Sequence, residues 1–312
     1  MGRNASTASG TPAHACPRAL AAVLICLSWL HAQPLRAGAV QALDTYFVHT
    51  ATVGNIDGPA TFLNHPTLSG QPDAIVLATQ RRSLDGGTGV LNPTEIGVFY
   101  DPADGGRWAV YNEDGSAMPP GAAFNVFLPA GDNAQVHVAT DPNSMLNWTN
   151  LEDPAANDNP AAKVFAIHNR SPGGIDTAPH DHVIGLWFSS QERWAVFNQD
   201  IVDMVAGTAF NAFVALTDPD VFTHTATADD SEAEITWIDH PTINGDARAW
   251  ILAAQNWSAA SVYNNHPIGV SYSPQRRRWA VFNQDDAAIP LSASFNLLVF
   301  GSGLFADGFE DP

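Results

Sequence analysis

One block of sequence occurs three times along this chain, and it constrains the fold more than any other feature. Each block holds a short segment that begins Ile-Gly and, a few residues later, a segment that begins Arg-Trp-Ala-Val. The Ile-Gly segments are Ile96–Tyr100, Ile184–Phe188 and Ile268–Tyr272, and the Arg-Trp-Ala-Val segments are Arg107–Asp114, Arg193–Asp200 and Arg278–Asp285. The three tryptophans are 86 and 85 residues apart. A fixed period of this kind is typical of tandem structural units.

Further matches extend the repeat over most of the chain. Each copy opens on a His-x-Ala-Thr segment, at His49–Thr52, His137–Thr140 and His224–Thr227, and closes on Phe-Asn, at Phe124-Asn125, Phe210-Asn211 and Phe295-Asn296. A third set of matching segments ends in proline and consists of Asn64–Pro66, Asp153-Pro154 and Asp239–Pro241. A fourth set consists of Thr79-Gln80, Ile167-His168 and Ala254-Gln255. Chance does not produce this many matches in one register, so the sequence predicts three copies of one unit.

The unit has the pattern of an all-β fold. Short segments rich in Val, Ile, Phe, Trp and Thr are separated by Gly, Pro, Asn and Asp at intervals of about 8–12 residues. In the third copy the six strands expected are Val221–Thr227, Glu234–Asp239, Ala249–Gln255, Ile268–Tyr272, Arg278–Asn283 and Ser294–Val299, with a hairpin turn at Ser273–Arg277. Six strands are enough for a small sandwich.

The predicted architecture is therefore three tandem β-sandwich-like repeats of about 85 residues, at 46–130, 134–217 and 221–301, followed by an acidic tail at 302–312. Short gaps such as 216–220 favour repeats that pack against one another, with pseudo-threefold symmetry, over units on a flexible string.

The N-terminal segment has the pattern of a signal peptide. Arg18 precedes the apolar run Ala19–Leu30, which is followed by the small residues Ala37–Ala39. A basic flank, a short apolar core and an A-x-A site are typical of an export signal, and the run is too short to span a bilayer. We therefore expect residues 1–39 to be removed near Ala39, and the protein to be secreted, whether extracellular, periplasmic or at the cell surface. Both cysteines lie in this segment, so the mature chain would have no disulfide.

The charge balance narrows the function classes. The chain has 32 acidic and 13 basic residues. The predicted mature part would carry a net charge of about −22, because the segment before position 40 holds three arginines and no acid. Such a surface repels phosphate backbones and argues against nucleic acid as a partner. After the signal, the sequence gives no reason to expect membrane insertion.

The repeats resemble an uncharacterised bacterial domain family. The resemblance rests on Asn264–Val270, Trp279–Asp285 and Val48–Thr52, covers about 46–300, and is best in the third copy. Copy one departs at Pro93-Thr94, where copy three has Asn265-His266, and copy two has Asp153 where the others have His65 and His240. Such families are known as domains of unknown function and occur in secreted, multi-copy proteins. The resemblance implies a secreted β-repeat protein and supplies no ligand.

The repeated polar residues are the first candidates for binding. An Asn-x-Asp triplet follows each tryptophan strand, and such residues either cap turn amides or gather for a sugar hydroxyl or a cation. Histidines at matched places either ligate a metal, act as a base, or make ordinary hydrogen bonds. The candidate ligand-binding residues are Asn112, Asp114, His168, His182, Asn198, Asp200, His224, Gln255, Asn264, His266, Asn283 and Asp285.

Tryptophans divide into two groups. Trp108, Trp194 and Trp279 alternate with valine in every copy, which predicts that they lie in the core. Trp148, Trp187, Trp237, Trp250 and Trp257 vary between copies, and any of them on the surface would offer a face for a sugar ring.

Three functions remain open at this point. The first is a non-enzymatic secreted binding or adhesion protein whose ligand is an extracellular or cell-surface glycan, since three related copies add avidity to weak sites. The second is an exported hydrolase with a carboxylate or histidine site between copies, although the sequence has no G-x-S-x-G elbow and no catalytic residue to name. The third is a purely structural surface protein. No cofactor is expected from the sequence, and calcium bound by the acidic turns could stabilise a protein of any of these three kinds.

Overall fold

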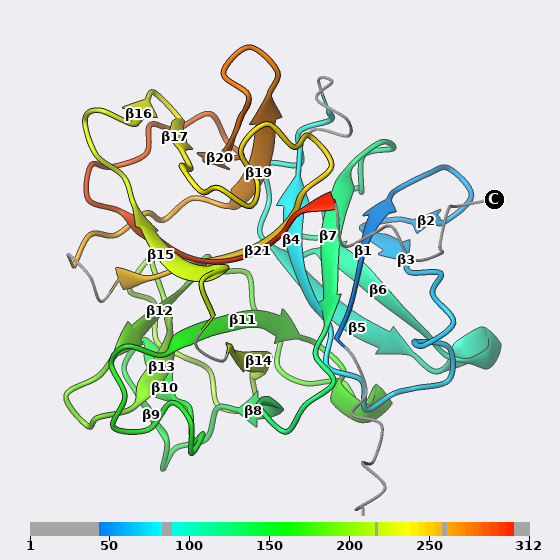
Figure 1. Cartoon of the computed structure of the whole chain (residues 1–312). Coiled ribbons are helices and arrows are strands. Elements are labelled where there is room, and N and C mark those ends of the chain that lie inside the picture. Colours follow the sequence, from blue (N-terminus) through cyan, green and yellow to red (C-terminus); the bar gives the residue numbers. More distant parts are fainter. Residues whose placement is uncertain (1–43, 83–88, 216–217, 258–260, 303–312) are drawn as a thin grey trace, which may run out of the picture. The chain divides into compact units, whose positions relative to one another are not determined.

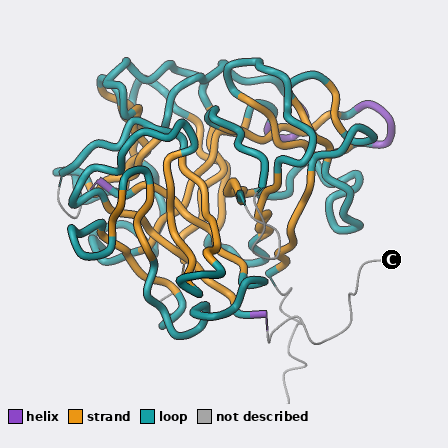
Figure 2. Tube along the Cα trace, turned by 90° about the horizontal axis from the view of Figure 1, so that it is seen from above, coloured by secondary structure: helices purple, strands orange, loops and turns teal. Residues whose placement is uncertain are grey.

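The computed structural model describes residues 44–82, 89–215, 218–257 and 261–302. These residues belong to one compact unit, Gln41–Pro312. The predicted signal segment at 1–39 and most of the predicted acidic tail lie outside the described residues. Within them the chain is almost entirely strand and loop, with helical turns limited to short 3-10 segments such as η1 (Ala103–Gly105) and η2 (Pro172–Gly174) (Figure 2).

Each repeat contributes seven strands, six of which correspond to the pattern expected from the sequence. In the first repeat they are β1 (Thr45–Thr50), β2 (Ile56–Asp57), β3 (Ala60–Phe62), β4 (Leu77–Arg81), β5 (Ile96–Asp101), β6 (Arg107–Asn112) and β7 (Ala123–Leu128). In the second they are β8 (Ala134–Val138), β9 (Ser144–Met145), β10 (Trp148–Asn150), β11 (Lys163–Asn169), β12 (Ile184–Phe188), β13 (Trp194–Asn198) and β14 (Ala209–Ala215).

The third repeat follows the same order and tests the sequence prediction directly. Its strands are β15 (Val221–Thr225), β16 (Ser231–Glu232), β17 (Ile235–Trp237), β18 (Trp250–Gln255), β19 (Ile268–Ser273), β20 (Arg278–Asn283) and β21 (Ser294–Phe300). The all-β prediction is confirmed, and β19 and β20 pair from Ile268–Asn283 to Ser273–Arg278, which is the expected hairpin. The strand that sequence reasoning missed is the two-residue β16.

The strands of one repeat are divided between two antiparallel groups. The first, fourth and seventh strands form a three-stranded group, as in β1-β7-β4, and the others form a four-stranded group, as in β2-β3-β6-β5. In the third repeat, buried side chains from both groups meet in one hydrophobic cluster that includes Ile251, Val270, Trp279 and Phe295. The two groups therefore face each other across a core, as in a small sandwich.

Neither group ends at the boundary of its own repeat. Strand β4 of the first repeat pairs in parallel with β19 of the third, and β11 of the second repeat pairs in parallel with β5 of the first (Figure 1). A parallel bridge between Leu186 and Asn256 connects the third repeat to the second at the corresponding position. The three-stranded group of each repeat thus joins the four-stranded group of another, in a closed cycle of three.

Three buried asparagines hold this cycle together. Asn125 donates its Nδ2 hydrogen to the carbonyl of Ile251 at 2.8 Å, Asn211 to Val76 at 2.9 Å, and Asn296 to Val164 at 3.0 Å. Each bond crosses from one repeat to another in the same cyclic direction as the sheet pairing. These are the asparagines of the Phe-Asn motif, so that motif is kept in every copy because each copy must pair with another.

The repeated tryptophans lie in the core, as predicted. Trp108, Trp194 and Trp279 are fully buried, and each donates its Nε1 hydrogen to a loop carbonyl of its own repeat, at Gln71, Asn159 and Asp246. A buried indole needs such an acceptor, since an unpaired N–H in a core costs free energy. Among the described residues, no helix is long and apolar enough to cross a bilayer.

Candidate functional site

The repeated Asn-x-Asp triplets hold turns. Asn112, Asn198 and Asn283 are buried, and each donates through Nδ2 to the carbonyl four residues later, at Ser116, Val202 and Ala287. The aspartates two residues on accept from backbone amides: Asp114 from Ser116, Asp200 from Val202 and Asp285 from Ala287. These contacts fix the chain after each tryptophan strand. The asparagine side chains are therefore occupied inside the fold.

Two of the aspartates also pair with a candidate histidine. The Nδ1 of His182 lies 2.7 Å from Asp200 Oδ2, and the Nδ1 of His266 lies 2.6 Å from Asp285 Oδ2. Both pairs are half-buried, so they remain in contact with solvent. In the first repeat the corresponding position is Thr94, and no such pair forms there. Of the candidates, these four residues are the ones that the structure brings together at the surface.

The histidines of the opening motif have a structural partner in every repeat. The Nε2 of His49, His137 and His224 lies 2.8 Å from the hydroxyl of Thr61, Thr149 and Thr236, respectively. Burial lowers the pKa of His49 and of His137 to about 4, and it also lowers the pKa of His224. The candidate His224 is thus a neutral hydrogen-bonding side chain near pH 7.

His168 lies at the junction between the first and second repeats. Its Nδ1 is 2.7 Å from Oε1 of Glu113, whose Oε2 accepts from the hydroxyl of Tyr111 at 2.6 Å. The side chains of His168 and Glu113 are only 3% and 2% exposed. Burial lowers the pKa of His168 to about 4 and raises that of Glu113 well above its ordinary range, because each charged form would lose its hydration. Burial therefore disfavours the charged form of both side chains.

Gln255 and Asn264 connect the third repeat to the second. Asn264 donates through Nδ2 to Gln255 Oε1 at 3.1 Å and exchanges two hydrogen bonds with Asn283, while its backbone amide donates to Oε1 of Gln199 at 3.0 Å. Gln255 Nε2 in turn donates to the carbonyl of His266. These contacts hold the loop around Asn264 against the second repeat.

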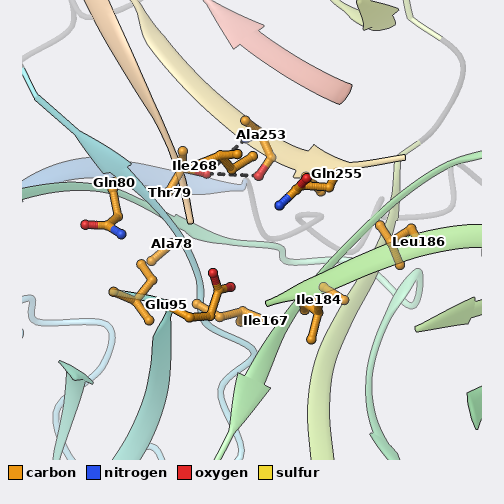
Figure 3. Close-up of a pocket in the computed structure, with 13 residues that line it drawn as sticks. Ala78, Thr79, Gln80, Glu95, Ile167, Ile184, Leu186, Ala253, Gln255 and Ile268 are labelled. Carbon is orange, nitrogen blue, oxygen red and sulfur yellow. Dashed lines mark hydrogen bonds between the residues drawn. The ribbon is translucent and has the colours of Figure 1, made fainter. Parts of the chain in front are cut away.

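A small cavity lies where all three repeats meet. It has a volume of about 50 Å³ and is lined by matched residues of the three copies, which are Ala78, Ala166 and Ala253 together with Ile96, Ile184 and Ile268. Figure 3 shows the carboxylate of Glu95 among these side chains, with Thr79 hydrogen-bonded to Ala253. Burial, followed by the charges of Glu113 and Asp181, raises the pKa of Glu95 to about 8. The space suits a few water molecules.

An aromatic cleft lies at the junction between the second and third repeats. Its volume is about 150 Å³, and it is lined by Trp148, Trp187, Phe197, Trp257, Tyr263 and the amide of Asn147. The rings stand edge to face, with centroids 5.4 Å apart for Trp148 and Trp187 and 5.8 Å apart for Trp187 and Trp257. Tyr263 is 43% exposed and lies directly before Asn264, so the loop that Gln255 and Asn264 hold in place carries one wall of this cleft.

One variable position makes this junction different from the other two. Two polar residues stand at the end of the fourth strand of each repeat, and the residue after them differs between the copies. It is Arg82 in the first repeat, Arg170 in the second and Trp257 in the third. Arg82 lies over the ring of Phe282, and Arg170 lines a pocket with Tyr111, Phe99 and three aspartates. Trp257 takes the matching place against Phe197. The junction of the second and third repeats is therefore aromatic where the others carry a guanidinium.

In the part of the chain that the structure describes, no group of three or more His, Cys, Asp or Glu side chains is arranged to hold a metal ion. His180, His168 and His182 come close, with neighbouring ring centroids 5.2 Å apart, but His180 Nε2 is bonded to Asn198 Oδ1 at 2.8 Å.

A model of the family described as "Domain of unknown function (DUF7452)" matches the chain three times, at residues 39–105, 102–214 and 185–299. The chain belongs to this family. The resemblance inferred from the sequence to an uncharacterised repeat family is thereby confirmed. The second and third matches share residues 185–214, so the family pattern runs from one repeat into the next, as the sheets do. No curated protein and no solved structure matches the chain.

For this DUF7452 chain, sequence reasoning located part of the aromatic cleft and missed the rest. Trp148, Trp187 and Trp257 belong to the variable tryptophans, and the structure brings these three together, whereas Trp250 is fully buried. Phe197 and Tyr263 were missed because they lie in a core strand and in a loop. The signal that could have found the cleft is the replacement of arginine by Trp257 at one repeat position.

Proposed function

We propose that this protein is an exported, non-enzymatic binding protein whose ligand is an extracellular glycan, and that the aromatic cleft is its binding site. The observation that carries the proposal is the cleft itself: Trp148, Trp187 and Trp257 converge beside the exposed ring of Tyr263. Sugar rings present apolar C–H faces, which stack on aromatic rings, and hydroxyl edges, which need polar partners. A space of about 150 Å³ is of the size that admits one six-membered ring.

The polar wall of the cleft fits the same ligand. Asn147 donates its Nδ2 hydrogen to the carbonyl of Asn198, which fixes the amide and leaves its Oδ1 as an acceptor for a hydroxyl. A site of apolar rings with one fixed polar group is the usual composition of a small-molecule pocket. The export signal predicted from the sequence of the first 39 residues supports an extracellular ligand.

The hydrolase alternative has weaker support. The one carboxylate of raised pKa in a cavity between repeats is Glu95, and that cavity has a volume of only about 50 Å³. The buried pair of Glu113 and His168 is nearly closed to solvent. A glycan that reached either place would have to separate the repeats.

The test is binding of the full mature chain to a glycan array, followed by titration calorimetry with each glycan that binds. Trp257→Ala and Tyr263→Ala should weaken binding at least tenfold, which corresponds to about 1.4 kcal/mol. Trp237→Ala is the matched control, because that indole lies under Arg276 outside the cleft. His266→Ala and Asp285→Ala test the surface pair predicted from the sequence. Absence of binding to every glycan by a folded chain would refute the proposal and favour a structural surface protein.

A further inference from the structure

A groove runs beside the aromatic cleft and shares two of its walls. Its volume is about 510 Å³, and Trp187 and Trp257, which line the cleft, also line the groove. These two rings stand edge to face with centroids 5.8 Å apart and form the wall common to the cleft and the groove, the aromatic ridge. A ligand longer than one sugar ring that fills the cleft can extend past this ridge into the groove.

The groove contains Lys163, the only lysine of the chain. Among the described residues that line the groove none carries a carboxylate; the other polar ones are Thr223, Thr225 and Asn256. This is unusual for a chain with 32 acidic residues. The groove is therefore a locally positive place on a surface that is otherwise strongly negative.

Lys163 has unused hydrogen-bonding capacity. Its Nζ donates to the carbonyl of Ala161 at 3.0 Å, and an ammonium group has three donors. Within the described ranges no Asp or Glu lies within ion-pair distance of it, whereas Arg193, Arg276 and Arg278 each pair with a carboxylate. Partial burial lowers the pKa of Lys163, because water solvates the ammonium incompletely there. An anion in the groove would replace that missing solvation.

We propose that the ligand is an oligosaccharide with carboxylate-bearing units: one ring occupies the aromatic cleft, the chain crosses Trp187 and Trp257, and a carboxylate in the groove pairs with Lys163. This inference rests on the proposed glycan-binding function and adds the substrate class. The aromatic ridge supplies contact with the sugar faces, the threonines and Asn256 line the path of the hydroxyls, and the ammonium selects the acidic unit. None of the described residues that line the groove carries a carboxylate that would repel the acidic unit there.

The experiment compares each acidic oligosaccharide with its own neutral form. Oligogalacturonate, oligomannuronate and hyaluronan oligosaccharides are titrated into the full mature chain at 0.15 M salt, each beside its methyl ester, which keeps the sugar rings and removes the charge. At least one acid should bind at least tenfold more tightly than its ester. Lys163→Gln should abolish this preference by weakening the binding of the acid to that of its ester, and Lys163→Arg should retain it.

The outcomes separate this inference from the function on which it rests. Equal affinity for acids and esters, or an acid preference that survives in Lys163→Gln, overturns the carboxylate selection while glycan binding stands. Binding of neutral glycans alone would likewise overturn the carboxylate selection while glycan binding stands. If no acidic or neutral glycan binds and the variants remain folded, the proposed function itself fails. Trp257→Ala serves as the common control, since it removes the ridge and should weaken acids and esters alike.

Discussion

Replacing Glu113 by Gln should stabilise this protein, and the gain should grow with pH. Glu113 is buried between the first and second repeats against His168 and Tyr111. The matching residues in the other copies, Gln199 and Gln284, are amides. A glutamine at 113 could donate to His168 Nδ1 through its amide and accept from the Tyr111 hydroxyl, so both hydrogen bonds have a replacement.

The expected magnitude follows from proton linkage. The carboxyl of Glu113 ionises at its ordinary pKa of 4.5 in the unfolded chain, while burial raises its pKa well above that value in the fold. A raised pKa makes a contribution to stability that is complete below pH 4.5 and is lost as the pH rises towards the folded value. Between these two pKa values each pH unit costs about 1.4 kcal/mol, so the penalty that Gln removes grows as the pH rises from 5 to 7.

Urea unfolding followed by tryptophan fluorescence at pH 5, 6, 7 and 8 measures this difference. Gln199→Glu is the mirror control: it places a carboxyl at the matching buried position, where Gln199 Oε1 accepts from the backbone amide of Asn264, and it should destabilise the chain more at pH 8 than at pH 5. A Glu113→Gln variant that is less stable than the native chain at pH 7, or whose stability difference is the same at every pH, would refute the reasoning.

Three further predictions concern the fold. Asn296→Ala should lower the free energy of unfolding by about 3 kcal/mol in the same urea assay, because it removes a hydrogen-bond partner of the Val164 carbonyl and of the Asn256 amide. The control Asn265→Ala removes an exposed side chain and should change the free energy of unfolding by less than about 0.5 kcal/mol. Between pH 6.5 and 4 the contribution of His49 and His137 to stability should fall with the pH, because their folded pKa values are about 4 and the unfolded state takes up protons first. His49→Gln should remove one of these contributions, so the variant should lose less stability than the native chain as the pH falls, and an equal change in both would contradict this. Gly269→Ala should destabilise the chain and lower its melting temperature in calorimetry, because a Cβ there would lie 2.6 Å from Gln284 Nε2 and 3.1 Å from the carbonyl oxygen of Gln80. Gly54→Ala should leave the melting temperature nearly unchanged, because the nearest atom to a Cβ there is 3.9 Å away.

The sequence predicted the strands well because their signals are local. Alternation and turn residues placed the ends of the six longer strands of the third copy within two residues of the observed ends. The tryptophans at 108, 194 and 279 were correctly placed in the core. What the sequence did not predict is which repeat pairs with which. The edge contact of Gln80 with Gly269 joins residues far apart in the chain, and nothing in either strand's own pattern specifies that partner.

The sequence showed one position at which copy two differs from the other copies, but not the structural reason for the difference. Copy two has Asp153 where the others have His65 and His240. In those copies the histidine ring stacks on a phenylalanine, with centroids 4.6 Å apart for His65 and Phe47 and 4.5 Å for His240 and Phe222. Copy two has Gln135 in place of that phenylalanine, so it lacks both members of the stacked pair.

The candidate site shows the limit of reasoning from repeated residues. Asn112, Asn198 and Asn283 recur because each copy needs the same turn, and Asn125, Asn211 and Asn296 recur because each copy needs the same contact with another. The residues that recur in all three copies are therefore those whose side chains already hold the fold together.

A ligand that is bound once, by contrast, requires a place where the copies differ. Trp257 and Lys163 are such places: the first replaces the arginines of the other copies, and the second is the chain's one lysine. Both line the groove at the junction of the second and third repeats, and Trp257 also lines the cleft. The threefold pattern supplies three similar junctions, and these two residues give one of them a tryptophan where the other two have an arginine, and a lysine in its groove.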